Sequence, residues 1–129
     1  MGKNLIQQAR GNGSPRYRAP SFRYKGQSKY ARSQKETLTG KIIDFIHCQG
    51  HSAPLAQIEY SNGSMVLIQA PEGVRVGDEV KMGNKIDIKK GNVLPLKNIP
   101  EGVAIYNLES SPGDGGKFVR SSGGFAKII

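Results

Sequence analysis

Short apolar runs separated by turn residues make up most of the chain from Thr37 onward. Val, Ile, Leu and Phe dominate these runs, while Gly, Pro, Asn and Asp stand between them, and this pattern predicts short β-strands. After Lys35 no stretch has the period of an amphipathic helix. The predicted strands cover residues 37–46, 55–60, 64–70, 76–82 and 93–96.

Turn chemistry and strand count together indicate the architecture. Asn62 and Gly63 stand between the second and third runs, and both residue types tolerate positive φ, so we expect a tight hairpin there. Gly40 predicts a bend or bulge, and Pro95 confines the fifth run to an edge or strand end because proline has no N–H to donate. Five short strands with little helix favour an all-β fold with a small, partly closed barrel of the OB type, because a sandwich needs about seven strands.

A second unit is expected to begin near Asn98. Residues 103–108 have the pattern of a strand, 110–116 form a long glycine-rich turn, and 117–120 and 125–129 are short strand candidates. The last run reaches the end of the chain, which predicts an unpaired β edge unless a partner or further residues cover it. A shortened chain and a split gene are both compatible with that ending.

The entire formal net charge of +9 lies in the first 35 residues, which we call the arm. The arm has no acid, whereas basic and acidic side chains balance in the rest of the chain. Glycine and proline interrupt regular structure in the arm, and few apolar groups offset the entropy of ordering it, so we expect disorder until a partner binds. Its basic residues are Lys3, Arg10, Arg16, Arg18, Arg23, Lys25, Lys29, Arg32 and Lys35.

Four aromatic residues are interleaved with these charges. They are Tyr17, Phe22, Tyr24 and Tyr30. Positive charge for phosphates together with flat rings that stack on unpaired bases is typical of a nucleic-acid-binding segment. The alternative is a tail that only keeps the protein soluble, but such a tail has no need of four aromatics.

Secreted and membrane proteins are poorly supported. The N-terminus lacks the apolar segment of a secretory signal, and no run approaches the roughly 20 apolar residues of a membrane span. Cys48 is the one cysteine, which suits a reducing compartment, so we expect a cytoplasmic protein. An Arg-rich, acid-poor start also fits an organelle transit peptide, although its glycines and prolines work against the helix that such a peptide forms.

Candidate chemical sites are weak. His47, Cys48 and His51 have the spacing of metal ligands, but no other Cys or His could complete a tetrahedral site, so we favour loop residues that bind nothing. Cys48 beside His47 also suggests nucleophilic catalysis, yet adjacent residues of an extended chain point to opposite sides. We therefore predict no enzyme, no cofactor, no metal and no small-molecule substrate.

The glycine-rich turn at 113–117 lacks the Gly and Ser or Thr that a phosphate-binding P-loop requires. Two interpretations stay open: backbone amides that approach a phosphate beside Lys117 and Arg120, or a plain loop.

Several segments follow one another in the order found in a known family. They are residues 1–8, 13–15, 18–20, 52–56, 70–73, 76–78, 91–96, 99–102, 107–117 and 120–123. Gly91-Asn-Val-Leu-Pro-Leu96 and Pro112-Gly-Asp-Gly-Gly-Lys117 are the most specific. The whole chain resembles the N-terminal part of the universal ribosomal protein L-two family, in its archaeal and eukaryotic branch.

The resemblance implies a cytoplasmic ribosomal protein embedded in large-subunit ribosomal RNA. The expected domains are the basic arm at 1–36, an OB-like domain at 37–97 and the beginning of an SH3-like domain at 98–129. Family members support subunit association and the peptidyl transferase region, but their Gly- and His-rich segment near that centre has no match here. Arg120 matches a family arginine implicated in RNA binding and is the best single transfer.

Two segments depart from the family pattern. The chain has His-Cys-Gln-Gly-His at 47–51 where the family commonly has His-Asp-Pro-Gly-Arg, and Met65 and Val66 where the family often has basic residues. We expect no family-type RNA contact from either place.

The resemblance therefore predicts a structural constituent of the large ribosomal subunit that binds its RNA and supports RNA folding, subunit association and the peptidyl transferase region. Lys117 and Arg120 are expected to add phosphate contacts to those of the arm. Its expected partners are large-subunit ribosomal RNA and neighbouring ribosomal proteins, without a homo-oligomer or a membrane. The alternative is a free OB-fold binder of single-stranded RNA or a translation factor, for which Phe45 and Tyr60 are the aromatics available on the barrel. A small metalloenzyme is a third, less favoured interpretation.

Overall fold

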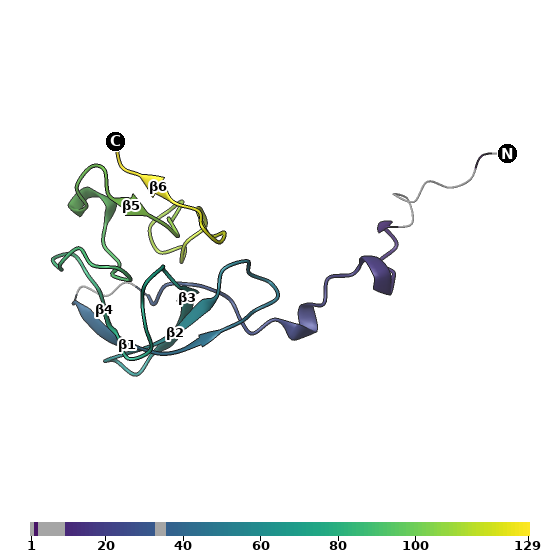
Figure 1. Cartoon of the computed structure of the whole chain (residues 1–129), viewed down its shortest axis with the longest axis horizontal. Helices are drawn as coiled ribbons and strands as arrows, with labels where there is room; N and C mark the ends of the chain where they lie inside the picture. Colours follow the sequence, from purple (N-terminus) through teal and green to yellow (C-terminus); the bar gives the residue numbers. More distant parts are fainter. Residues whose placement is uncertain (1, 3–9, 33–35) are drawn as a thin grey trace.

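The computed structural model describes residues 2, 10–32 and 36–129. Over these residues the chain forms a body of short strands, and residues 10–25 of the arm run away from it as an extended segment (Figure 1). The regular elements are β1 (Leu38–Ile46), β2 (Leu55–Tyr60), β3 (Met65–Gln69), β4 (Glu79–Met82), β5 (Ala104–Ile105), β6 (Ala126–Lys127) and the single-turn 3-10 helices η1 (Pro15–Tyr17), η2 (Ser21–Arg23) and η3 (Leu96–Asn98). The all-β fold class is confirmed. Within the described ranges, no helix has the length and apolar character of a membrane span.

The first four strands form one antiparallel sheet in the order β3-β2-β1-β4. β1 is the long central strand, and it pairs with β2 on one side and with β4 on the other. Strands β3 and β4 lie at opposite edges, so in the described part of the chain the sheet is open.

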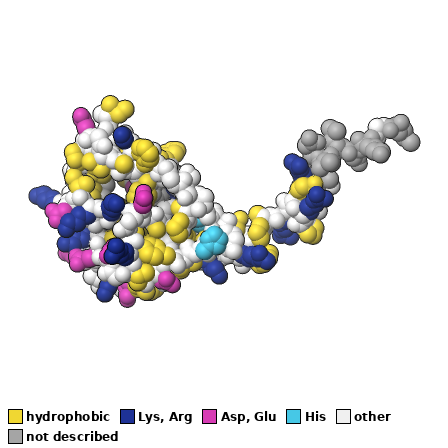
Figure 2. Space-filling model, viewed as in Figure 1, with side chains coloured by type: hydrophobic (Ala, Val, Ile, Leu, Met, Phe, Trp, Pro, Cys, Tyr) yellow, Lys and Arg dark blue, Asp and Glu magenta, His cyan; other side chains and the backbone are white. Residues whose placement is uncertain are grey.

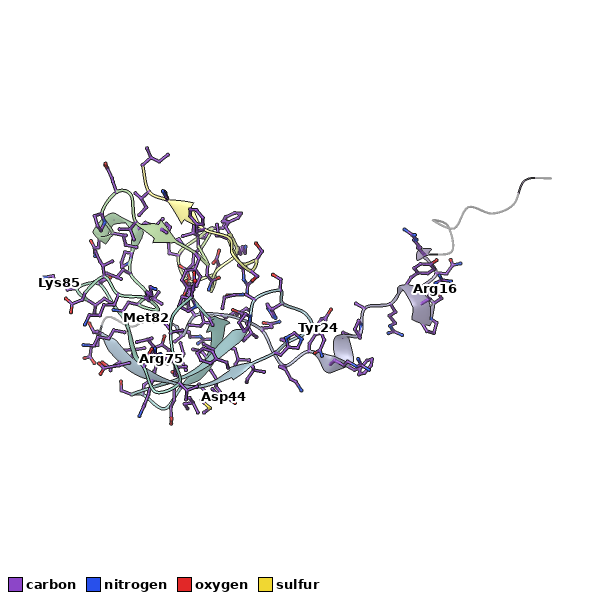
Figure 3. The ribbon with its side chains drawn as sticks, in the orientation of Figure 1. Arg16, Tyr24, Asp44, Arg75, Met82 and Lys85 are labelled. Carbon is purple, nitrogen blue, oxygen red and sulfur yellow. The ribbon has the colours of Figure 1, made fainter. Side chains whose placement is uncertain are left out.

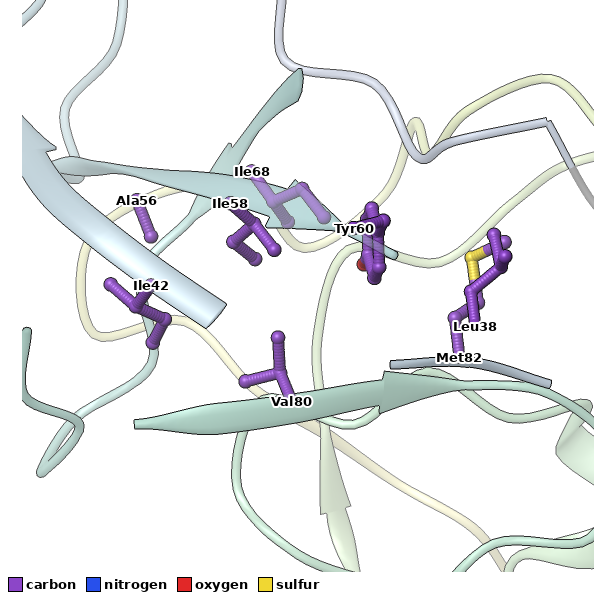
Figure 4. Close-up of a cluster of buried hydrophobic side chains, with 8 residues drawn as sticks. All are labelled: Leu38, Ile42, Ala56, Ile58, Tyr60, Ile68, Val80 and Met82. Carbon is purple, nitrogen blue, oxygen red and sulfur yellow. The ribbon is translucent and has the colours of Figure 1, made fainter. Parts of the chain in front are cut away.

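Alternate residues of these strands point into one hydrophobic core (Figure 4). In β1, Leu38, Gly40 and Ile42 are buried while Thr39 and Lys41 between them are exposed, as expected of a sheet with one covered face. Burial of each large aliphatic side chain contributes about 1.5–3 kcal/mol. The buried members of the core are Leu38, Ile42, Ala56, Ile58, Tyr60, Ile68, Val80 and Met82.

The irregularity of β1 does not lie at Gly40. The register against β2 shifts between Ile42 and Asp44 instead. A Cβ at position 40 would lie 2.6 Å from Tyr60 Cδ1 and 2.9 Å from Ile58 Cγ2. Glycine is therefore required because the Tyr60 ring approaches the β1 backbone, and the predicted bend at this residue is wrong.

The predicted hairpin at Asn62-Gly63 is confirmed. Gly63 has φ +78°, and the N–H of Tyr60 donates to the carbonyl of Ser64 at 3.0 Å. Asn62 Oδ1 accepts from the N–H of Ser64, also at 3.0 Å. The turn joins β2 to β3, which pair antiparallel with Glu59 opposite Met65.

Several predicted strands are shorter than expected. In the C-terminal unit the runs 103–108 and 125–129 are reduced to β5 and β6. The run at 93–96 is reduced to one parallel bridge between Met82 and Val93, because Pro95 cannot donate and η3 begins at the next residue. The run at 76–82 begins only at Glu79, because the chain first turns through Gly77, whose φ is +93°.

The C-terminal unit contains β5 and β6, which pair antiparallel, and a bridge between Leu108 and Phe118. Asn107 and Val119 both have positive φ, 52° and 56°, and the N–H of Asn107 donates to the carbonyl of Val119 at 2.9 Å. Positive φ is strained for a β-branched residue, so the surrounding contacts must hold Val119 in place.

Candidate nucleic-acid interface

The outer arm, which we define as residues 10–25, projects from the body and exposes all its basic side chains (Figures 1 and 2). Figure 2 shows basic and hydrophobic side chains along it and no acidic ones. Pro15 begins the turn η1, and Pro20 directly precedes the turn η2. Because proline disfavours a continuous helix, these residues keep the segment extended. The basic residues concerned are Arg10, Arg16, Arg18, Arg23 and Lys25.

Arginines of the outer arm lie over its aromatic rings. Arg10 Cζ and Arg16 Cζ are 5.3 and 5.8 Å from the centroid of Tyr17, and Arg23 Cζ is 5.5 Å from that of Phe22. Each such cation–π contact contributes about 0.5–1 kcal/mol at an exposed site. Phe22 remains 82% exposed, so its ring is open to a stacking partner.

The arm meets the body at Tyr24, which Figure 3 labels at the junction. A Cβ at Gly50 would lie 3.2 Å from Tyr24 Cδ2, so the ring covers the loop between β1 and β2. The N–H of Lys25 donates to Cys48 Sγ at 3.4 Å. These contacts attach the outer arm to that loop.

Cys48 is fully buried in this loop, and its partner is His51 rather than the adjacent His47. The distance from His51 Nδ1 to Cys48 Sγ is 3.3 Å. The N–H of Lys25, and then the hydrogen bond with His51, lower the pKa of the thiol to about 7. Among the described residues no group of three His, Cys, Asp or Glu side chains could hold a metal ion.

The arm root, which we define as residues 26–32, is packed against the body. Ser28 is 2% exposed. The N–H of Lys29 donates to the carbonyl of Leu67 in edge strand β3 at 3.1 Å, and the N–H of Tyr30 donates to the carbonyl of Gly115 at 3.2 Å. The root therefore lies between the four-stranded sheet and the C-terminal unit.

Tyr30 does not fit the predicted role in base stacking. Its ring packs against the hydrophobic core, and its hydroxyl donates to the carbonyl of Asn107 at 2.7 Å. Burial raises the pKa of Tyr30 far above its ordinary value. The sequence pattern groups Tyr30 with the exposed aromatics because its neighbours are basic, but the fold uses it to join two units.

Arg120 also points into the protein. Its Nη2 donates to the carbonyl of Ser28 at 2.7 Å. With the Gln69 amide oriented so that its oxygen faces the guanidinium, that oxygen accepts from Nε at 3.0 Å and from Nη2 at 3.1 Å. In this structure the guanidinium of Arg120 therefore contacts Ser28 and Gln69 of the chain itself.

The glycine-rich turn is filled by its own carboxylates. Glu109 accepts from the N–H groups of Gly113 (3.1 Å) and Gly115 (3.0 Å). Asp114 accepts from those of Ser110, Ser111 and Gly116, and these bonds hold the pKa of its carboxyl below the ordinary value. A phosphate would have to displace two acids, so the structure favours a plain loop.

The remaining basic residues predicted to bind RNA that the structure describes lie on the glycine-rich turn and on the arm root. Lys117 is exposed on the turn, 3.9 Å from Asp114, and Lys29 and Arg32 are exposed on the arm root. Lys3 and Lys35 lie outside the described residues. Among the described residues, basic side chains therefore gather away from acids on the outer arm.

Sequence reasoning missed three buried polar residues where the arm root meets the body. Ser28, Gln69 and Asn107 are each at most 3% exposed. The sequence contains one indication that Gln69 is buried, because it is a polar residue within the apolar run 64–70. It contains none for Ser28 and Asn107, because their surroundings depend on contacts between distant segments.

The fold and the arm together define a small antiparallel β protein with an exposed, basic and aromatic extension. Residues 89–129 match the family model described as Ribosomal Proteins L2, C-terminal domain.

Curated relatives match the chain over its whole length. It is 47% identical over 133 residues to the large ribosomal subunit protein uL2 of Methanococcus vannielii, covering 56% of that protein. It is 49% identical to the uL2 of Methanothermobacter thermautotrophicus and 48% identical to that of Methanocaldococcus jannaschii, each over 133 residues and 55% of the relative. The chain is similar to these uL2 proteins over its whole length, and it spans about half the length of the curated relatives that it matches.

Proposed function

We propose that the chain is a structural constituent of the large ribosomal subunit that binds large-subunit ribosomal RNA. The observation that carries this proposal is the outer arm, whose exposed arginines, lysine and aromatics face no acid, in a chain related throughout to uL2 proteins. Its place would be the cytoplasmic ribosome, and its other partners would be neighbouring ribosomal proteins. No catalytic role or cofactor is proposed for its residues.

The outer arm would act in two ways. Arg10, Arg16, Arg18, Arg23 and Lys25 would neutralise phosphates, which supplies affinity without sequence preference. The rings of Tyr17, Phe22 and Tyr24 would stack on unpaired bases, and 2′-hydroxyls in such regions distinguish RNA from DNA. Lys3, Lys29, Arg32, Lys35 and Lys117 would add further phosphate contacts.

The body would dock by shape. We assign it an OB-like domain at 37–97 and the beginning of an SH3-like domain at 98–129, after an arm at 1–36. The shift in β1 between Ile42 and Asp44 and the bridge from Met82 to Val93 support a sheet that curls toward a partly closed barrel. Roles in subunit association and in the peptidyl transferase region would belong to the longer uL2 proteins.

A free OB-fold binder of single-stranded RNA is the alternative function. Such a protein presents aromatics on the open face of its barrel. Tyr60 is 2% exposed and Phe45 is half-buried against the core, so neither ring is presented in that way. The aromatic exposure on the arm favours the ribosomal assignment.

The test measures RNA affinity against salt concentration. Because residues 26–32 pack on the body, the arm should be neutralised by substitution rather than deleted. A variant with Arg10, Arg16, Arg18 and Arg23 changed to Gln should show a salt slope smaller by about 3, at about 0.7–0.9 per lost phosphate contact.

The matched control changes four exposed lysines of the body to Gln and removes the same charge. These are Lys85, Lys89, Lys90 and Lys97. The control should alter the slope much less. An equal change in the two variants would refute the arm as the main electrostatic contact.

A further inference from the structure

We propose that Arg120 is a positioning residue for RNA binding: it holds the arm root against the body and so fixes where the outer arm leaves it. The inference rests on the proposed function of the arm. It replaces the direct phosphate contact that sequence reasoning assigns to this arginine.

The guanidinium of Arg120 connects three parts of the chain. Nη2 donates to the Ser28 carbonyl at 2.7 Å, and Nε and Nη2 reach the Gln69 oxygen at 3.0 and 3.1 Å. In the same orientation of the amide, Gln69 Nε2 donates to Ser28 Oγ at 2.7 Å. Ser28 and Gln69 are 2% and 3% exposed, so without Arg120 the Ser28 carbonyl and the Gln69 oxygen would be left buried without this donor.

Other bonds join the arm root to the same two surfaces. The N–H of Lys29 donates to β3 through the carbonyl of Leu67, and the N–H of Tyr30 donates to the carbonyl of Gly115. The Tyr30 hydroxyl reaches the carbonyl of Asn107 at 2.7 Å. Arg120 is the charged group of this cluster, and it is separated from Ser28 by 92 positions in sequence.

This geometry has a consequence for binding. Because Nε and Nη2 of the guanidinium already donate hydrogen bonds within the protein, they are not available for a bidentate contact with a phosphate. A fixed root lets the outer arm leave the body at one place, which reduces the entropy lost when the arm binds. Lysine at position 120 would keep the charge but lose the planar fork, so it should not restore the cluster.

The first test is amide hydrogen exchange without RNA, on the full chain. Arg120→Ala, Arg120→Lys and Gln69→Ala should each speed the exchange of the Lys29 and Tyr30 amides by about tenfold or more, because local opening becomes easier. Arg75→Ala removes the same charge from an exposed position on the body (Figure 3) and should leave these amides unchanged.

The amide of Ile58 in the central sheet reports global unfolding and should keep its protection in every variant. If the Lys29 and Tyr30 amides keep theirs in Arg120→Ala, the proposal is wrong. If Ile58 exchanges faster as well, the Gln69→Ala variant, which retains Arg120, decides between local release and general instability.

The second test measures affinity for large-subunit ribosomal RNA. Gln69→Ala leaves Arg120 in the chain, yet it should weaken binding as Arg120→Ala does, and the double variant should be no weaker than either. Normal binding by Gln69→Ala beside weak binding by Arg120→Ala would establish a direct phosphate contact and overturn the proposal. Absence of RNA binding by the unchanged chain would overturn the proposed function instead, and the exchange result would still decide whether Arg120 holds the arm root.

Discussion

Gly40→Ala would place a methyl group against buried side chains of the sheet. The new Cβ would lie 2.6 Å from Tyr60 Cδ1 and 2.9 Å from both Tyr60 Cε1 and Ile58 Cγ2. Tyr60 and Ile58 are 2% and 4% exposed, so neither side chain has solvent to move into. Either the ring must shift or β1 must separate from β2.

The magnitude follows from two opposing effects. Overpacking a filled core costs about 1–3 kcal/mol. Replacing glycine in a strand by alanine returns about 0.5–1 kcal/mol, because the unfolded chain loses less backbone freedom. The difference is about 0–2.5 kcal/mol, and because three new contacts would lie below 3.0 Å we expect a net loss in its upper part, about 1–2.5 kcal/mol, in the free energy of unfolding.

Equilibrium urea unfolding followed by far-ultraviolet circular dichroism measures this loss, since the chain has no tryptophan. The midpoint should fall while the denaturant slope stays constant. Gly2→Ala, with no atom within 4 Å of its Cβ, is the matched control and should be neutral. In a Tyr60→Leu background the cost of Gly40→Ala should shrink, because the ring is gone. A midpoint at or above that of the unchanged chain, or the same cost in both backgrounds, would refute the packing argument.

Further predictions concern the core, the buried thiol and the glycine-rich turn. Ile42 is 1% exposed, so Ile42→Ala should lower the free energy of unfolding by about 2–5 kcal/mol in the same urea assay. A smaller loss in Ile42→Ala than in Ile42→Val would contradict the assignment of this side chain to the core. The pKa of the Cys48 thiol is lowered from 9.0 to about 7, first by the N–H of Lys25, so between these values the unfolded chain binds more protons than the folded one. The free energy of unfolding should therefore increase between about pH 7 and about pH 9, and this contribution should be lost as the pH falls through 7. In thermal melts across this range, Cys48→Ala should remove the increase. Asp114→Asn should speed amide exchange at Gly116 at neutral pH, whereas in the unchanged chain this protection should be lost only as acid protonates the carboxylate below its ordinary pKa of 3.8.

Local patterns were enough to predict the strands of the sheet. The second strand was predicted at its observed bounds, Leu55–Tyr60, because apolar residues and turn chemistry on both sides define it. The hairpin was predicted from the φ preferences of Asn62 and Gly63, and of these two residues Gly63 adopts positive φ. The fifth strand was overpredicted, because an apolar run does not reveal whether a partner strand is available to pair with it.

Contacts between distant segments were not predictable in this way. Gly40 looked like a bend because the sequence does not show that the Tyr60 ring lies against it. The contacts of Tyr30 and Arg120 within the chain were not predicted, because charge and aromaticity are visible in the sequence while burial is not. Their actual partners, Asn107 and Ser28, are 77 and 92 positions away. The outer arm was easier to predict, since its composition alone determines its charge.

Competition between two ribosomal RNAs tests the proposed function most directly. Labelled large-subunit ribosomal RNA would be bound by the full chain at physiological salt and then challenged with unlabelled large-subunit or small-subunit RNA. Non-specific phosphate binding treats the two competitors alike, whereas a specific site does not. We predict that large-subunit RNA displaces the label at much lower concentration than small-subunit RNA. Equal displacement by the two RNAs would contradict a specific place in the large subunit.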